Sequence, residues 1–178
     1  RNHPVGFFIK DMLPELSKRF EVIIFNTSEF EDEISLYAKK FCQWINVQAK
    51  KEYEIADIIY RKNVDLLVDS SGLTRTNNLG VFKLRPSNNQ VSWAGWLAST
   101  NLKEMDYVIS DNFCTQKKDE KFFSEKILRM RNIWCTYSLS VLENLNLKKE
   151  NNSEPFIIYG CFQRPEKITK KVLSTWLN

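Results

Sequence analysis

The sequence is poor in the residue types that usually mark a metal site or a disulfide framework. It has one histidine, His3, and its four cysteines form no C-x-x-C pair: they are Cys42, Cys114, Cys135 and Cys161. Zinc sites usually need closely spaced cysteine and histidine ligands, so the spacing disfavours zinc as well as a set of disulfides. Four unpaired thiols are typical of a reducing compartment, and we expect a cytoplasmic protein.

Long apolar runs and strongly basic stripes are also missing. No run reaches the roughly 18 apolar residues that would suggest a membrane-spanning helix. The net charge of +4 comes from 26 basic and 22 acidic residues, and the short basic clusters lie beside acids. Nucleic-acid binding would call for basic residues concentrated on one face. We therefore expect neither a membrane nor a nucleic acid as partner.

What is present alternates between strand-like and helix-like segments, which predicts an α/β fold. Strands are expected at residues 21–25, 65–69 and 105–111, and helices at residues 29–40 and around 49–60. In the second helix an apolar stripe is expected from residues at helical spacing: Ala49, Tyr53, Ala56, Ile59 and Tyr60. The tryptophans Trp44, Trp93, Trp134 and Trp176 are interpreted as core residues.

Two glycine-containing loops follow expected strands. DLLVD (residues 65–69) continues into SSGLTRTNN, and a short strand in NQVSWAGWLAST leads to the second loop. Ligands of α/β sheets gather where strands end, so both loops are candidate site segments. Asp69, Asp106 and Asp111 lie at strand ends, but without a D-x-D motif we assign them structural roles.

The end of the chain has a separate pattern. After the polar segment 143–155, the stretch PFIIYGCF predicts a strand and RPEKITKKVLSTWLN predicts a helix beginning near Pro165. A helix N-terminus attracts anions, and Arg164 and Lys167 flank this one. Phosphate is therefore the expected ligand of this turn.

Four stretches together resemble the protein O-linked N-acetylglucosamine transferases and their SPINDLY-like relatives. They are RNHPVGFF, LVDSSGLTRTNNLGVFKLRPSNNQVSWAGWLASTNLKEMDYVISD, FSEKILRM and GCFQRPEKI. The resemblance implies a Rossmann-like lobe of a GT-B glycosyltransferase, truncated at both ends. Residues 1–142 would form the N-terminal catalytic lobe without its first strand, residues 143–154 a linker, and residues 155–178 the start of the C-terminal nucleotide-binding lobe.

The resemblance also implies site residues. His3 matches the family's active-site histidine, and Lys167 matches the lysine that meets the donor diphosphate. Arg164, Gly95 and Pro4 would line the donor side. Leu73 and Arg75 would lie on the acceptor side. Around Gly95 the sequence has Trp96, Leu97, Ala98 and Ser99 in place of the family's usual GYPGT, and Val5 replaces a common threonine.

The implied reaction is transfer of N-acetylglucosamine from UDP-N-acetylglucosamine to serine or threonine hydroxyls of proteins. It would invert the anomeric centre and use no metal or other cofactor, so the implied partners are a sugar nucleotide and a protein or peptide acceptor. The alternative is a non-catalytic α/β module that binds a nucleotide or a protein, and the isolated 178 residues are expected to be inactive. A full second lobe after Asn178 would favour the enzyme.

Overall fold

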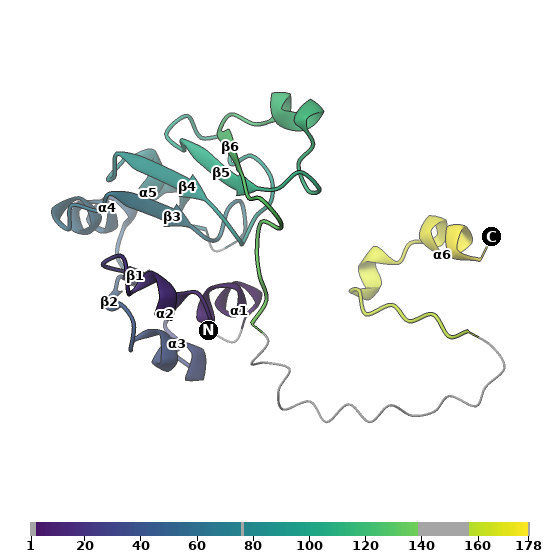
Figure 1. Ribbon diagram of the computed structural model, residues 1–178, viewed down its shortest axis with the longest axis horizontal. Helices are drawn as coiled ribbons and strands as arrows, with labels where there is room; N and C mark the ends of the chain where they lie inside the picture. The colour runs from purple at the N-terminus through teal and green to yellow at the C-terminus, as the bar shows by residue number, and fades with distance from the viewer. Residues whose placement is uncertain (1–2, 76, 139–156, 178) are drawn as a thin grey trace. The chain divides into compact units, whose positions relative to one another are not determined.

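Two parallel β-sheets form the frame of residues 1–145, the first of two units in the computed structural model. The structure describes residues 3–75, 77–138 and 157–177 (Figure 1). The linker predicted at residues 143–154 lies outside these ranges, so the division into lobes stays a prediction. The second unit, residues 146–178, is described by itself.

The larger sheet has the strand order β3-β4-β5-β6, and every neighbouring pair is parallel. Its strands are β3 (Leu66–Asp69), β4 (Asn89–Ser92), β5 (Tyr107–Ser110) and β6 (Lys126–Arg129). This confirms the α/β prediction. Because parallel strands end at the same side of a sheet, the loops after them lie at one edge. We call the loops at residues 70–75, 93–101, 111–116 and 130–138 the carboxyl edge.

Helices α4 (Glu52–Arg61) and α5 (Leu79–Lys83) form the main core with β3. The buried residues of this core include Ile55, Ile59, Leu67 and Phe82. A capping box starts α4, in which the Lys51 amide donates to the Glu54 carboxylate at 2.8 Å.

The stripe expected on α4 is wrong in part. Ala56 and Ile59 are buried, but Tyr53 and Tyr60 are 60% and 69% exposed. The buried side of the helix is instead completed by Ile55. A phenol ring tolerates solvent at its polar end, which makes tyrosine a poor marker of the buried face of a helix.

The smaller sheet pairs β1 (Ile23–Asn26) with β2 (Gln43–Asn46) in parallel. Helix α3 (Glu33–Ala38) joins them and is shorter than expected, because Asp32 caps it by accepting the Ser35 amide at 3.0 Å. Before them stand α1 (Pro4–Lys10) and α2 (Leu13–Leu16). Each has a proline in its first turn, where a missing amide hydrogen does no harm.

The second unit corrects two expectations. Residues 157–162 of the expected strand 155–162 form no strand, and their side chains are exposed. The expected helix does not begin at Pro165: residues Pro165–Lys167 form the short 3-10 helix η3, and α6 spans Lys170–Trp176. Thr169 starts α6 because its hydroxyl accepts the Val172 amide at 3.3 Å.

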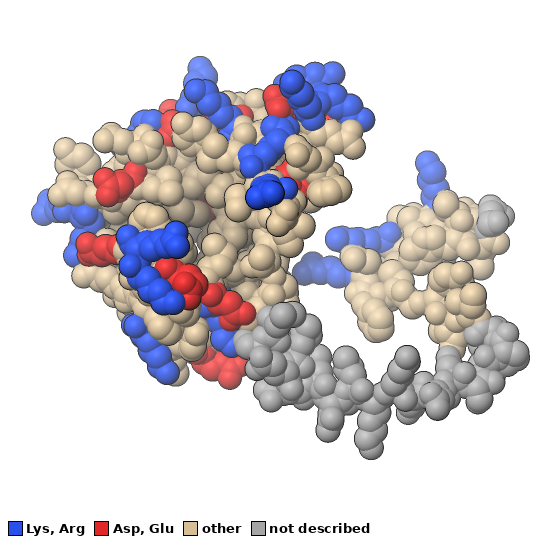
Figure 2. All heavy atoms as spheres, in the orientation of Figure 1, with Lys and Arg blue, Asp and Glu red and all other residues tan. Residues whose placement is uncertain are grey.

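Charges of both signs are interspersed over the face of residues 3–138 drawn in Figure 2. The basic group at its upper right belongs to the 3-10 helix η1 (Lys117–Phe122), where Asp119 and Glu120 stand among the lysines. Among the helices the structure describes, none has the length and apolar character that a bilayer crossing requires.

Candidate functional site at the carboxyl edge

Two glycines allow the first two loops of the carboxyl edge to pack closely against each other. A Cβ added to Gly95 would lie 1.9 Å from the carbonyl oxygen of Ser70. One added to Gly72, which has a φ of +53°, would lie 2.0 Å from the Cβ of Trp96. Each glycine therefore allows a close approach that any side chain would block. The structure thus brings together the two loops that the sequence singled out separately.

Asp69, at the end of β3, stabilises the first of these loops through hydrogen bonds to its side chain. Its buried carboxylate accepts the Ser71 amide at 3.1 Å, the Ser71 hydroxyl at 2.8 Å and the Gly72 amide at 2.8 Å. These bonds bend the chain directly after β3. The structural role expected for Asp69 is confirmed.

Asp111 likewise accepts backbone amides of the loop after β5, and it also accepts an amide from the distant segment at residues 131–138. Its Oδ1 accepts the amides of Phe113 and Cys114 at 2.9 and 2.7 Å, and its Oδ2 accepts the amide of Trp134 at 2.9 Å. The Cys114 amide is the main reason that the pKa of Asp111 lies below its usual value, although burial acts to raise that pKa. A charged Asp111 therefore fastens residues 131–138 to the sheet.

Residues 131–138 in turn join helix α1 to the carboxyl edge. The Trp93 indole donates to the Trp134 carbonyl at 2.8 Å, and the Trp134 ring lies 6.2 Å from the Phe8 ring, edge to face. The Ser138 amide donates to the Phe7 carbonyl at 3.1 Å. The helix that begins after His3 is thereby tied to the loop that contains Gly95.

His3 is exposed and caps α1. Its Nδ1 accepts the Val5 amide at 3.4 Å, and its carbonyl accepts the Phe7 amide. When Nδ1 accepts, a neutral imidazole carries its proton on Nε2. The Nε2–H group can then donate a hydrogen bond outward. Pro4 follows as the first residue of the helix and is also exposed.

The predicted acceptor-side residues are open to solvent. Leu73 is 50% exposed and Arg75 is exposed, and both follow Gly72 in the first loop. Arg164 and Lys167 lie in the second unit, where the Lys167 amide donates to the Arg164 carbonyl at 2.9 Å and both side chains are exposed. The structure thus places Leu73, Arg75 and Gly95 on two adjoining loops and His3 and Pro4 at the start of α1, while Arg164 and Lys167 belong to the second unit.

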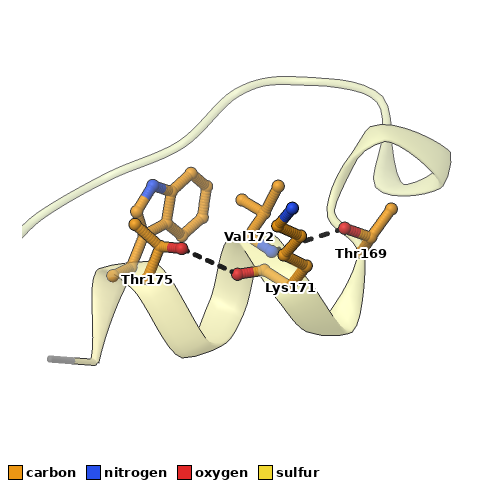
Figure 3. Close-up of a pocket in the computed structure, with 5 residues that line it drawn as sticks. Thr169, Lys171, Val172 and Thr175 are labelled. Carbon is orange, nitrogen blue, oxygen red and sulfur yellow. Dashed lines mark hydrogen bonds between the residues drawn. The ribbon is translucent and has the colours of Figure 1, made fainter.

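A shallow hollow of about 250 Å³ lies along α6 (Figure 3). It is lined by Thr169, Lys171, Val172, Thr175 and Trp176, which come from this helix and its cap. None of them is a predicted site residue, and one helix face does not enclose a ligand. Trp176 is 56% exposed, so the expectation that it is a core residue is wrong.

Sequence reasoning missed Glu125, which contacts the last residues of the second loop from the start of β6. It is buried directly before β6, and its carboxylate accepts hydrogen bonds from Ser99 and Thr100 in the second loop. Burial acts to raise the pKa of Glu125, but the bonds from Thr100 and Ser99 bring it below its ordinary value. The contact spans about 25 residues of sequence, and no local pattern signals it.

Over the described ranges, no group of three or more His, Cys, Asp or Glu could hold a metal ion.

Comparisons with known proteins agree with this fold. Residues 1–139 match the family model described as Glycosyl transferase family 41. A mutant of the O-GlcNAc transferase of Thermobaculum terrenum shares the fold with a TM-score of 0.70 and 24% identity, over 76% of this chain and 26% of that one.

Curated relatives match along nearly the whole chain. The Arabidopsis thaliana protein named probable UDP-N-acetylglucosamine–peptide N-acetylglucosaminyltransferase SPINDLY is 27% identical over 98% of this chain and 20% of its own length. Its rice counterpart is 28% identical over 98% of this chain and 19% of its own. The chain thus spans about a fifth of the length of these relatives. With a parallel α/β lobe and a family match over residues 1–139, the chain belongs to glycosyl transferase family 41.

Proposed function

We propose that this chain contributes the acceptor-facing lobe of an enzyme that transfers N-acetylglucosamine from UDP-N-acetylglucosamine to serine or threonine hydroxyls of proteins. The observation that supports this most is the family match over residues 1–139, which includes the whole carboxyl edge. The names of the Arabidopsis and rice relatives give UDP-N-acetylglucosamine as the donor and a peptide as the acceptor.

In the proposed reaction the acceptor oxygen attacks the anomeric carbon opposite the leaving group. The new bond to that carbon forms as the bond to the β-phosphate oxygen breaks, and the electron pair leaves with UDP. The acceptor hydroxyl releases its proton to solvent water, so that the products are the glycoside, UDP and one proton. This in-line course inverts the anomeric centre, and a fixed cation can stabilise the leaving diphosphate without a metal.

Each predicted residue has a place in this scheme. Lys167 and Arg164 would meet the diphosphate, as exposed cations beside a short helix. Gly95 would let backbone approach the donor, with Pro4 nearby. The Nε2–H group of His3 would donate a hydrogen bond on the acceptor side, because its Nδ1 already accepts the Val5 amide. Leu73 and Arg75 would line the path of the acceptor.

The cytoplasm is the compartment we propose. All four cysteines are free, and burial raises the pKa of the Cys42, Cys114 and Cys135 thiols. A raised pKa keeps a thiol protonated and slow to react. Thiols of this kind suit a reducing environment.

Calorimetry of UDP binding tests the donor assignment, on the full-length product of the gene. We expect Lys167→Ala to weaken UDP binding by more than about tenfold, roughly 1.4 kcal/mol. The matched control is Lys170→Ala, another exposed lysine three residues further on, which should bind as the unsubstituted protein does. If neither the unsubstituted protein nor its variants bind UDP, the enzyme assignment fails and the non-catalytic module becomes the better account.

A further inference from the structure

The buried Glu125 carboxylate makes four hydrogen bonds that converge on the loop at residues 95–101. Its Oε1 accepts the Thr100 amide at 2.6 Å and the Thr100 hydroxyl at 2.5 Å. Its Oε2 accepts the Ser99 hydroxyl at 2.7 Å and the Ser124 hydroxyl at 3.2 Å. Three of the four donors belong to the loop itself or to its last turn. The carboxylate therefore connects this loop to the start of β6.

The direction of these bonds is fixed by the surrounding amides. Ser99 Oγ accepts the Asn101 amide at 3.0 Å and the Ser124 amide at 3.3 Å, which fills both of its lone pairs. Its single proton is then left for the nearest acceptor, Glu125. The Thr100 hydroxyl likewise accepts the Leu102 amide at 3.4 Å. The site thus demands an acceptor on both carboxyl oxygens, which an ionised glutamate supplies and a glutamine does not.

No cation balances this buried charge among the ion pairs of the described residues. A buried carboxylate is costly unless hydrogen bonds replace its lost hydration. Here the loop supplies that replacement, so loop order and the charge of Glu125 depend on each other. Asn101, with a φ of +58°, lies in a conformation that asparagine tolerates better than most residues, and it too is held by Ser99.

We infer that Glu125 is a positioning residue for the loop at residues 93–101, which carries Gly95 and, in the proposed function, faces the donor: by holding Ser99 and Thr100 it sets the place of Gly95 and Trp96. Glu125 acts through the loop, at the far end from the Gly95 contact with Ser70. The inference rests on the proposed function for the ligand that the loop faces, and on the hydrogen bonds alone for the order of the loop.

The first test measures the loop without any ligand. In the full-length product of the gene, amide hydrogen exchange at Thr100 and Asn101 is compared between the unsubstituted protein, Glu125→Gln and the control Glu104→Gln. Glu104 is partly buried, and the hydrogen bonds it makes here go to its backbone carbonyl, which Glu104→Gln keeps, so this variant should exchange normally. Glu125→Gln should speed exchange at Thr100 by at least about tenfold. Unchanged exchange would overturn the inference.

The second test measures the consequence for the donor. Glu125→Gln should raise the KM for UDP-N-acetylglucosamine by about tenfold and leave the KM for a peptide acceptor unchanged, because a displaced loop misplaces one substrate. Faster exchange with an unchanged donor KM would show a structural role only and would overturn the inference. If the unsubstituted protein transfers no sugar, the proposed function fails, and the exchange result still decides whether Glu125 holds the loop.

Should Glu125→Gln fail to fold, Ser99→Ala provides a milder variant. It removes one of the four bonds to Glu125, together with the acceptor of the Asn101 and Ser124 amides, and keeps both bonds from Thr100. We expect a rise in donor KM of about threefold with normal acceptor KM. An equal rise in the KM for the donor and in the KM for the acceptor would contradict a role confined to the donor side.

Discussion

The two units of the chain hold their predicted site residues by different means. In the first unit, contacts between distant segments fix the loops: Gly95 against Ser70, and Asp111 with the Trp134 amide. In the second unit, Arg164 and Lys167 are held by hydrogen bonds between near neighbours, and their side chains are exposed. A substitution in the first unit should therefore disturb folding as well as function. One in the second unit should act on ligand binding with little effect on stability.

A methyl group at Gly95 gives the largest expected effect and tests this comparison directly. In Gly95→Ala the new Cβ would lie 1.9 Å from the Ser70 carbonyl oxygen, and backbone must move to make room. We expect the free energy of unfolding to fall by about 3 kcal/mol, as measured by urea denaturation. The control is Gly160→Ala in the second unit, where the nearest atom is a Phe162 ring carbon at 3.6 Å. That variant should change stability by less than about 0.5 kcal/mol, and an equal loss in both would contradict the comparison.

Acid should lower the free energy of unfolding of the first unit, because Asp111 loses its charge. Its folded pKa is lowered by the Cys114 amide, so its charge stabilises the fold above the unfolded pKa of about 3.9. That contribution is lost as the pH falls below about 4 and through the lowered folded value. Asp111→Asn should be less stable at neutral pH and should show a flatter loss of stability in acid.

The exposed Asp65 provides the control for this pH experiment. Thermal unfolding is followed at several pH values for Asp111→Asn, Asp65→Asn and the unsubstituted protein. Asp65→Asn should keep the steeper acid dependence. If Asp111→Asn keeps it as well, the stability of the carboxyl edge does not depend on this carboxylate.

The smallest effect is expected at Thr169, which caps α6 in the second unit. Thr169→Ala removes the acceptor of the Val172 amide and should cost about 1 kcal/mol of local helix stability. Hydrogen exchange at Val172 should quicken by about fivefold, while exchange in β3 to β6 stays the same. Thr175→Ala is the control, because its hydroxyl donates to the Lys171 carbonyl inside the helix and caps nothing (Figure 3). Faster exchange in β3 to β6 as well would contradict a purely local capping role for Thr169.

Local signals in the sequence predicted the parts of the fold that local contacts decide. The strand at residues 65–69 and the loop after it follow from an apolar run that ends in Asp69 and Gly72, and β3 is found at Leu66–Asp69. The expectation of a strand failed for residues 157–162, because an apolar run forms a strand only when another strand pairs with it, and no strand among the described residues pairs with this run.

The residues of the candidate site stay predictions from resemblance, and the contacts that hold their loops gave no signal in the sequence. Resemblance supplied His3, Gly95 and Lys167 from short motifs. The contacts that hold the loops, such as Gly72 with Trp96 and Glu125 with Thr100, join segments about 25 residues apart. Composition and periodicity describe neighbours along the chain, so they give no account of such pairs.

The tryptophans of the carboxyl edge give the protein a built-in optical reporter. Trp93, Trp96 and Trp134, three of its five tryptophans, lie on these loops, and two of their indole groups make hydrogen bonds there. Indole emission shifts with the polarity and order of its surroundings. Binding or displacement at the loops would therefore change the intrinsic fluorescence without a label, and replacing Trp44 and Trp176 by phenylalanine would leave an emission that follows the carboxyl edge.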